Sequence, residues 1–423
     1  MLQVPYIREN KDLIIARLKV RNMDATDTLN KIIEADKNRR ETQQKLDDVL
    51  ASSNAKAKEI GILFKQGKGA EANELKQETS QLKATSKTLQ ETFNTYSDEV
   101  KQLLYLVPNV PHESVPEGKS DADNVEIFSE GALPTLHADA QPHWELTKKY
   151  DLIDFELGVK ITGAGFPVYT GKGARIQRAL AGFFLDQATE KGYREVQPPL
   201  LINEASGYGT GQLPDKEGQM YHSPVDDLYL IPTAEVPVTN MYRDVIVKTE
   251  DLPIKNTAYS QCFRREAGSY GSDVRGLNRL HQFDKVEIVQ ITHPSKSMAA
   301  LDEMVEYVKT LLQKLELPFR IVRLCGGDLG FTSVLTYDFE VYSAAQEKWL
   351  EVSSISNFET FQANRLKCRY RDENNKPQLV HTLNGSALAF PRILAALLEN
   401  NQTPEGIKIP KELAKYTGFD IIK

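Results

Sequence analysis

The chain has 423 residues, with 40% apolar and 26% charged residues, a composition typical of a folded protein of two or three domains. No stretch approaches 18 apolar residues and the first ten residues lack the apolar core of a signal peptide, so we expect a cytoplasmic protein without a membrane partner. A net charge of -7 argues against a protein that coats nucleic acid without specificity, because such binding depends on neutralising phosphates.

Apolar residues recur every seven positions between residues 72 and 103, which predicts a long helix with one packing seam. One set of seam positions is Leu75, Leu82, Leu89, Tyr96 and Leu103, and the offset set is Ala72, Thr79, Ser86, Phe93 and Val100. Two glycines, Gly67 and Gly69, permit a tight turn before this helix.

A second, weaker seam lies upstream of the turn, at Leu29, Ile32, Leu46, Leu50, Ala57, Ile60 and Phe64. Polar Asp36, Arg39 and Gln43 interrupt its first half, so we expect a looser base there. The two seams together predict an antiparallel coiled-coil hairpin over about residues 27–103, with its tip near 65–69 and each helix roughly 50 Å long. Four lysines gather near the tip, at positions 56, 58, 65 and 68.

Three prolines between Val107 and Pro116 end the second helix, which divides the chain into an N-terminal domain (1–106), a linker (107–118) and a second domain (119–423). The second domain has short strand-like runs without a regular βαβ alternation. This texture predicts an α+β fold on a mixed, mainly antiparallel sheet flanked by helices. One helix is expected from Ala174 to Lys191, stopped by Gly192, with these residues facing inward: Ile176, Leu180, Phe183, Phe184 and Ala188.

Two β-patterned runs between Tyr259 and Val289 flank a glycine-rich loop, whereas P-loop, GxGxxG, HExxH and GxSxG signatures are missing. If both runs are regular strands, alternation places charged and aromatic side chains on one face: Arg264, Glu266, Arg279, Phe283 and Glu287. Guanidinium, phenyl and carboxylate groups together suit ATP beside an amino acid. A surface sheet with alternating salt bridges explains the pattern alone equally well.

The segment from Cys262 to Gly271, followed by His281 to Glu287, closely resembles motif 2 of bacterial-type seryl-tRNA synthetases, which are class II aminoacyl-tRNA synthetases. Further segments resemble that family in the same order: the long helical arm, motif 1 at about 174–201, the TAE strip Thr233-Ala234-Glu235, the segment Glu351-Val352-Ser353-Ser354, and motif 3 at about 384–399. The resemblance covers nearly the whole chain, with motif 2 at about 259–289.

The resemblance implies that serine and ATP form seryl-adenylate and that the seryl group then passes to tRNA-Ser. It implies catalytic roles for Arg264 and Arg392, with Arg264 bridging the serine carboxylate and the α-phosphate and Arg392 on the γ-phosphate side. The implied serine-binding residues are Thr233, Ala234, Glu235, Arg264, Glu287 and Ser386. The implied ATP-binding residues are Arg264, Arg265, Glu266, Arg279, Phe283, Glu351, Val352, Ser353, Ser354 and Arg392, with Phe283 stacking on adenine and Glu266 accepting from its amino group.

Magnesium is the implied cofactor, with Glu351 and Ser354 as its ligands. Strict alternation would separate these two residues, so we expect a bulge or a strand end between them. Zinc is not expected, because Cys262, Cys325 and Cys368 form no recognisable ligand cluster. The family also implies a homodimer through motif 1, an arm that reads the shape of tRNA-Ser, and a loop at 268–276 that orders on ATP or the acceptor end. Whether tRNA-Sec is a second substrate stays open.

Motif 3 departs from many bacterial relatives, since Ala387 and Pro391 stand where those carry glycines, so the backbone entry to Arg392 is expected to differ in detail. Three rival hypotheses remain at this stage: a noncatalytic RNA-binding relative, a ligase that loads a carrier protein, and a purely structural coiled coil. The intact set of charged motif residues disfavours the first, the long arm disfavours the second, and the roughly 300 residues beyond the linker disfavour the third.

Overall fold

A computed structural model describes residues 1–266 and 275–423. Its contacts divide the chain into two compact units, one of residues 1–19 and 23–108 and the other of residues 20–22 and 109–423. In the described part of the chain, no helix combines the length and the apolar character that crossing a membrane requires.

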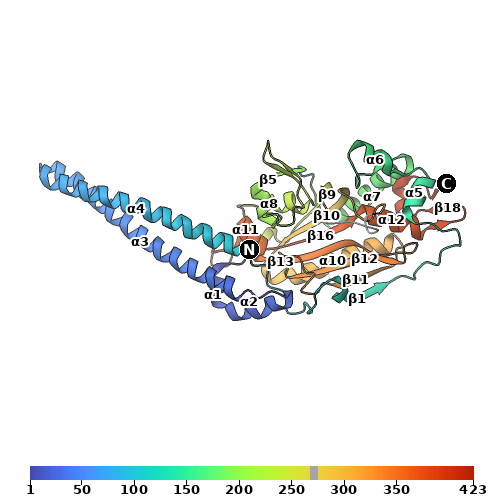
Figure 1. Cartoon of the computed structure of the whole chain (residues 1–423), viewed down its shortest axis with the longest axis horizontal. Coiled ribbons are helices and arrows are strands. Elements are labelled where there is room, and N and C mark those ends of the chain that lie inside the picture. The colour runs from blue at the N-terminus through green and yellow to red at the C-terminus, as the bar shows by residue number, and fades with distance from the viewer. Residues whose placement is uncertain (267–274) are drawn as a thin grey trace. The chain divides into compact units, whose positions relative to one another are not determined.

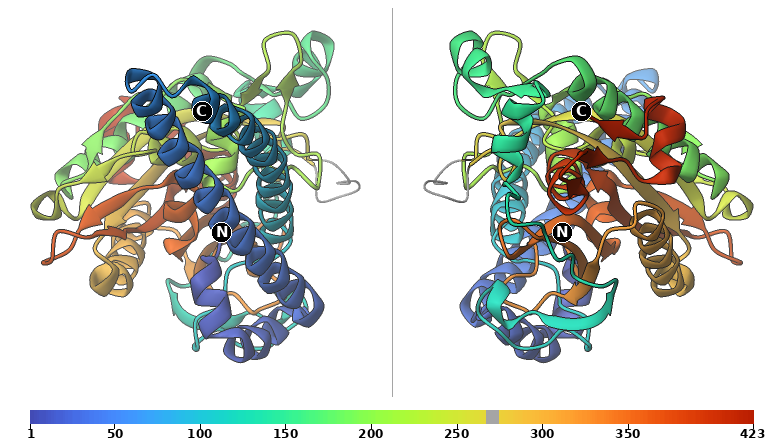
Figure 2. Two further views of the ribbon diagram at one scale, coloured as in Figure 1. Left: turned by 90° about the vertical axis from the view of Figure 1, so that its left-hand side faces the viewer. Right: turned by 90° about the vertical axis from the view of Figure 1, so that its right-hand side faces the viewer.

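Two long helices dominate the first unit, α3 (Thr26–Lys65) and α4 (Gly69–Leu104), and run side by side as a hairpin (Figures 1 and 2). Their 40 and 36 residues correspond to about 60 and 54 Å, somewhat longer than the sequence predicts. Gly67 lies in the turn with a φ of +75°, a conformation that glycine adopts without steric cost. Two short helices that the sequence did not predict, α1 (Val4–Glu9) and α2 (Lys11–Leu18), precede the hairpin.

The seam of the hairpin follows the heptads only in part. Leu29, Ile32 and Leu46 are buried as predicted, but Leu50 and Phe64 are 43% and 52% exposed. Leu63 is buried instead of Phe64, because α3 shifts its apolar face by one residue near the tip. Ala57 is exposed as well, so the prediction of these three seam positions was wrong.

The base of the hairpin is more ordered than the polar interruptions suggest. Asp36 is 1% exposed, and its carboxylate lies 2.7 Å from Arg39, 2.9 Å from Arg40 and 3.7 Å from Arg8. Burial raises the pKa of Asp36, but the hydrogen bonds from Arg39 and Arg40 outweigh it, so the pKa falls below its usual value. A neutralised buried carboxylate thus ties α1 to α3 where the sequence suggested looseness.

The second unit is built on an eight-stranded sheet, mixed in direction, in which only the pairing of β4 with β9 is parallel among the described strands. In spatial order the strands are β1 (Val125–Glu130), β11 (Phe319–Arg323), β12 (Leu335–Ser343), β13 (Lys348–Glu359), β16 (His381–Ala389), β10 (Gln282–Thr292), β9 (Ile254–Phe263) and β4 (Arg194–Glu195). The predicted α+β fold with a mainly antiparallel sheet is confirmed.

Smaller elements surround this sheet. The short strands are β2 (Ile153–Asp154), β3 (Val168–Tyr169), β5 (Leu201–Asn203), β6 (His222–Ser223), β7 (Leu228–Leu230), β8 (Ile246–Val247), β14 (Arg369–Arg371), β15 (Pro377–Leu379), β17 (Gln402–Thr403), β18 (Gly406–Lys408) and β19 (Ile421–Ile422). The shorter helices are α5 (His143–Lys149), α6 (Phe155–Ile161), α8 (Glu204–Thr210), α9 (Glu235–Asn240), α11 (Thr360–Leu366) and α13 (Lys411–Thr417).

Three longer helices pack their apolar sides against the sheet: α7 (Gly171–Glu190), α10 (Ser297–Lys314), which runs along the strands in Figure 1, and α12 (Phe390–Asn400). Helix α7 begins three residues before the predicted start, and all five of its predicted inward residues are buried. Gly192, just beyond it, has a φ of +83°, as its role in stopping the helix requires. The helices and one face of the sheet thus form the apolar core.

Side-chain alternation gives the central strands one apolar and one polar face. Ile288, Leu383, Ile355 and Phe339 belong to the core cluster, and each is followed or preceded by a polar residue that points the other way. Because directly paired residues share a face, the polar residues line up across four strands. The pairs are Glu287 with Ser386, Asn384 with Ser356, and Ser354 with Asp338. This polar face is where a site can be built.

Candidate active site

A buried carboxylate lies at the centre of the polar face. Glu287 is 1% exposed; Thr233 Oγ1 donates to its Oε2 at 3.1 Å and Asn384 Nδ2 donates to its Oε1 at 3.0 Å. Lys285 forms an ion pair with the same carboxylate and donates to Thr233 Oγ1 at 2.9 Å. Lys285 and Glu287 are two residues apart in β10, which pairs with β9 in regular register here, so strand alternation places both side chains on one face. Glu287 is therefore fixed in orientation and largely neutralised.

A second buried carboxylate, Glu235, stands at the first turn of α9. Gln362 Nε2 donates to it at 2.7 Å, and Gln362 is itself held by Thr382, whose hydroxyl donates to the Gln362 oxygen at 2.7 Å. Burial and the nearby Glu287 carboxylate raise the pKa of Glu235 to about 7. A negative charge at Glu235 thus lacks a full counter-charge in this state, and a cation bound there would supply it.

Arg264 and Phe283 come together next to this pair. The guanidinium lies over the ring at 5.3 Å from the centroid, and its Nε donates to the Pro232 carbonyl at 3.3 Å. The Pro232 carbonyl immediately precedes the TAE strip, so Arg264 is tied to the segment that carries Glu235. Arg264 directly follows the last residue of β9, so it lies next to the polar face.

The strands on either side of the glycine-rich loop stop earlier than expected at their loop ends. Strand β9 ends at Phe263 and β10 begins at Gln282, so Arg264, Glu266 and Arg279 lie outside regular strands and strand alternation does not place them. Glu266 has a φ of +49°. Its carboxylate nevertheless meets Arg279 at 3.1 Å, because the backbone bends beyond the strand ends. The predicted loop at 268–276 lies outside the described residues except for Arg275 and Gly276.

A β-bulge at Val352 brings Glu351 and Ser354 to one face. In the pairing of β12 with β13, Phe339 is opposite Ser353 and Glu340 is opposite Glu351, which leaves Val352 unpaired. The extra residue reverses the alternation, so both predicted metal ligands line the same cavity. Of the two expected irregularities, a bulge or a strand end, the structure has a bulge.

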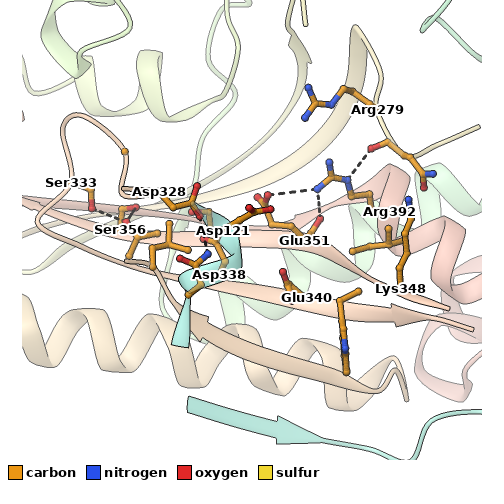
Figure 3. Close-up of a pocket in the computed structure, with 18 of the residues that line it drawn as sticks. Asp121, Arg279, Asp328, Ser333, Asp338, Glu340, Lys348, Glu351, Ser356 and Arg392 are labelled. Atoms are coloured by element: carbon orange, nitrogen blue, oxygen red, sulfur yellow. Dashed lines mark hydrogen bonds and ion pairs between the residues drawn. The ribbon is translucent and has the colours of Figure 1, made fainter. Parts of the chain in front are cut away.

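This cavity has a volume of about 710 Å³ and lies over β12 and β13. Its walls carry carboxylates and cations: Asp121, Asp328, Asp338, Glu340, Glu351, Arg279, Lys348 and Arg392 (Figure 3). Asp338 shares the face of Ser354, and its Oδ1 is buried without a hydrogen-bond partner in the described structure. Burial first, and the Glu351 carboxylate second, raise the pKa of Asp338 well above its ordinary value. The cavity therefore has capacity for a cation.

Arg392 enters the cavity from the first turn of α12. Its Nη1 donates to the Glu351 carbonyl at 2.8 Å and lies 3.6 Å from the Glu351 carboxylate, and its Nε donates to the Asn278 carbonyl at 2.9 Å (Figure 3). Pro391 occupies the first turn of the same helix, a position where the missing N–H costs no hydrogen bond. Arg392 is thus held at two carbonyls with its charge directed along the cavity wall.

The remaining predicted site residues are mostly buried or held by backbone hydrogen bonds. Ala234, Val352, Ser353 and Ser386 are 0%, 1%, 2% and 8% exposed, so the first three present almost no surface to a ligand. Ser353 Oγ donates to the Ser386 carbonyl at 2.6 Å, and Arg265 is tied through its backbone N–H to the Gln219 carbonyl at 2.9 Å.

Several polar residues of the site escaped sequence reasoning: Lys285, Asn384, Gln362 and Asp338. Lys285 lies within the quoted motif and two residues from Glu287, and this spacing was a usable signal. Gln362 and Asp338 reach the site only through tertiary packing, which no local pattern reports.

The sequence of the chain matches known protein families and curated relatives. Residues 1–111 match the model of the seryl-tRNA synthetase N-terminal domain, and residues 220–401 match that of the class II tRNA synthetase core domain for G, H, P, S and T. The serine–tRNA ligase of Salinibacter ruber is 50% identical, with 99% of this chain and 98% of the relative covered. That of Chlorobaculum parvum is 45% identical, with 100% of both covered.

Solved structures agree along the whole chain. A seryl-tRNA synthetase from Pyrococcus horikoshii complexed with ATP superposes with a TM-score of 0.87 at 33% identity, covering 100% of this chain and 99% of the other. A cytoplasmic serine–tRNA ligase from Naegleria fowleri in complex with AMP gives 0.86 at 26% identity, with the same coverage. The chain therefore belongs to the seryl-tRNA synthetase family of class II aminoacyl-tRNA synthetases.

Proposed function

We propose that the chain joins L-serine to ATP, releasing pyrophosphate and forming seryl-adenylate, and then transfers the seryl group to tRNA-Ser. The serine carboxylate attacks the α-phosphorus, and the bond to the pyrophosphate oxygen breaks. No protein nucleophile is needed, so the protein's work is alignment and charge stabilisation. The observation that carries the proposal is the polar face itself: Asn384, which donates to Glu287, pairs with Ser356 of a cavity that Arg279 and Arg392 also line.

Serine selection falls to the two buried carboxylates. Glu287 already has Lys285 as counter-ion, whereas Glu235 has an amide partner and a raised pKa, so we assign the serine ammonium to Glu235. Glu287 and Thr233 then face the hydroxyl. Alanine and glycine would leave these polar groups without that partner, which costs affinity, while threonine must be excluded by size.

ATP binding would exchange the ion pairs seen here for pairs with the nucleotide. Arg279 is paired with Glu266 and Arg392 with Glu351, so each cation is held close to its place by a carboxylate. We assign Arg264 to the α-phosphate, Phe283 to adenine, Glu266 to the adenine amino group, and Arg279 and Arg392 to the outer phosphates. Bidentate guanidinium contacts suit phosphate oxygens.

The cavity wall fits a magnesium ion. Glu351, Ser354 and the unpartnered buried Oδ1 of Asp338 are hard oxygen donors on one face, the ligand type that magnesium prefers. Glu351 and Ser354 would hold the ion, with Asp338 as a neighbouring acceptor. When bound, it would neutralise phosphate charge and help to keep ATP in one conformation.

We assign the hairpin α3–α4 to tRNA-Ser and the boundaries 1–106, 107–118 and 119–423 to the tRNA-binding domain, linker and catalytic domain. A-form and irregular RNA is read largely by shape and backbone, which a long helical surface can contact. Of the tip lysines, Lys56 pairs with Glu78 and Lys68 with Glu71, so RNA phosphates would compete with these glutamates. We further propose a homodimer through motif 1 and a cytoplasmic location.

The experiment that tests the function is aminoacylation with purified chain, ATP, magnesium and radiolabelled serine. Transcribed tRNA-Ser should be charged, and a tRNA with a short variable arm should not. The same assay with tRNA-Sec in place of tRNA-Ser shows whether tRNA-Sec is a second substrate. Failure to charge tRNA-Ser by a folded protein would instead support the noncatalytic RNA-binding relative.

A further inference from the structure

A buried histidine and glutamate pair lies outside the residues assigned to substrates. His143 begins α5, Glu399 lies near the end of α12, and both side chains are 0% exposed. His143 Nδ1 lies 2.7 Å from Glu399 Oε1, and the His143 backbone N–H donates to the same oxygen at 2.9 Å. The Ser343 hydroxyl donates to the other oxygen. Burial raises the pKa of Glu399, but the His143 and Ser343 hydrogen bonds outweigh it and lower the pKa. The glutamate is therefore ionised and fully hydrogen-bonded.

The other ring nitrogen of His143 accepts a hydrogen bond from the backbone. Leu277 N–H donates to Nε2 at 2.8 Å, so Nε2 carries no proton and Nδ1 donates to Glu399. Gly276 has a φ of +65°, and a Cβ there would lie 2.3 Å from Nε2. The ring thus lies directly against the backbone of residues 276–277, at a distance that only glycine permits.

The same backbone segment leads directly to the phosphate arginines. The Asn278 carbonyl accepts from Arg392 Nε at 2.9 Å, and the next residue is Arg279; both arginines line the cavity. A second connection runs from Asn278 Nδ2 to Gln346 Oε1 at 2.9 Å, and from Gln346 Nε2 to Glu399 Oε1 at 3.1 Å. Residues 277 and 278 are therefore both tied to the buried pair, one by each route.

We propose that His143 and Glu399 are positioning residues that hold the backbone of 276–278 so that Arg279 and Arg392 present their guanidiniums to the ATP phosphates. This inference rests on the proposed function of the two arginines. The critical element is the unprotonated Nε2 as acceptor for Leu277 N–H, and Glu399 selects that tautomer by accepting from Nδ1. Misplacement of substrate-aligning groups by about 1 Å can cost about 100-fold in rate, so a distant anchor can affect the reaction.

Two substitutions separate the acceptor role from simple neutralisation of Glu399. In His143→Gln the amide oxygen reaches the place of Nε2 and can still accept from Leu277. In His143→Asn the shorter amide reaches only the place of Nδ1 and can still donate to Glu399. In serine-dependent ATP–pyrophosphate exchange we expect His143→Asn to raise the KM for ATP about tenfold, with the KM for serine within about twofold of wild type. His143→Gln should stay within about threefold for both.

A control is His381→Ala, which removes a half-buried histidine that is bonded to Ser297 Oγ at 2.8 Å and begins β16, whereas Arg392 follows the opposite end of that strand. It should leave both KM values unchanged. The reverse order, with Asn tolerated and Gln impaired, or equal rises in both KM values for the Asn variant, would overturn the proposal and leave only a structural role for the pair.

A double-mutant cycle gives an independent test. In an Arg392→Ala background, His143→Asn should raise the KM for ATP by clearly less than it does in wild type. The reason is that only Arg279, of the two arginines that the pair positions, is still present. Full additivity contradicts the proposal. If the Asn variant does not fold, Gln346→Ala, at a partly exposed turn, cuts only the second route and should raise the KM for ATP about threefold; no rise would count against positioning.

The proposed function and this inference can fail separately. If wild-type protein catalyses serine-dependent exchange but the His143 variants do not follow the expected order, the inference alone is wrong. If the wild type catalyses no exchange, the proposed function fails, and calorimetric ATP affinities of the wild type and the two His143 variants decide the inference by the same order.

Discussion

Glu235→Gln should stabilise the free protein while damaging serine binding. In the ligand-free state the Glu235 carboxylate is buried beside Glu287, and these surroundings raise its pKa from an ordinary 4.5 to about 7. Glutamine keeps the size of the side chain and an oxygen that can accept from Gln362, but it removes the charge. The substitution should therefore relieve an unfavourable charge that, under the proposed function, the ammonium group of bound serine would balance.

The magnitude follows from proton linkage. A raised pKa means that the folded protein holds a proton that the unfolded chain has lost, so stability falls as the pH rises from 4.5 to 7 and then levels off. A pKa shift of this size lowers the free energy of unfolding by about 3 kcal/mol at pH 8. At pH 5, where folded Glu235 is still protonated, the loss is about 1 kcal/mol. Because glutamine does not ionise, Glu235→Gln should raise the free energy of unfolding by the corresponding amount at each pH.

Differential scanning calorimetry without ligands measures this effect. We expect the melting temperature of Glu235→Gln to exceed that of wild type by about 5 °C at pH 8 and by about 2 °C at pH 5. The exposed Glu250 provides a matched control, because Glu250→Gln should change neither value. In exchange assays at pH 8 the KM for serine should rise at least about tenfold for Glu235→Gln, since a charged hydrogen bond is lost. A variant that is destabilised at pH 8, or equally stabilised at both pH values, would refute the reasoning.

Three further predictions address other parts of the molecule. Arg264→Ala should lower serine-dependent exchange at least about 100-fold with an unchanged melting profile, because alignment and phosphate charge are lost; near-normal exchange would remove Arg264 from the mechanism. Deleting residues 30–100 should leave exchange within about twofold but reduce charging of tRNA-Ser below about 1%, and unchanged charging would contradict the role of the arm. Ser354→Ala should raise the magnesium concentration for half-maximal exchange about tenfold, as measured by titration at fixed ATP; an unaltered titration would exclude Ser354 as a ligand.

The hairpin and the α+β class were predictable because each depends on a local signal. The heptads predict two helices, and Gly67 lies in the turn between them with a positive φ, whereas Gly69 is already the first residue of α4. The conflict between alternation and a shared role for Glu351 and Ser354 predicted either a bulge or a strand end, and the structure has a bulge at Val352. The point at which strand alternation disagreed with the expected shared role therefore indicated where the strand is irregular.

What could not be predicted depends on contacts between distant segments. The seam near the tip changes register by one residue, from Phe64 to Leu63, because packing against α4 overrides the simple repeat. Arg279 meets Glu266 only after the chain leaves its strands, and no alternation rule describes that bend. His143 and Glu399 lie 256 positions apart, and neither has a neighbour in sequence that signals the pair.

The measurement that tests the central claim most directly is ATP–pyrophosphate exchange without tRNA, across serine, threonine, alanine and glycine, with magnesium present. Activation of serine through Glu235, Glu287 and Arg264 predicts strong exchange with serine and, with the other three, rates lower by about 100-fold or more. Equal exchange with alanine would contradict the assignment of the polar pocket, and no exchange with any of the four would contradict adenylate formation itself.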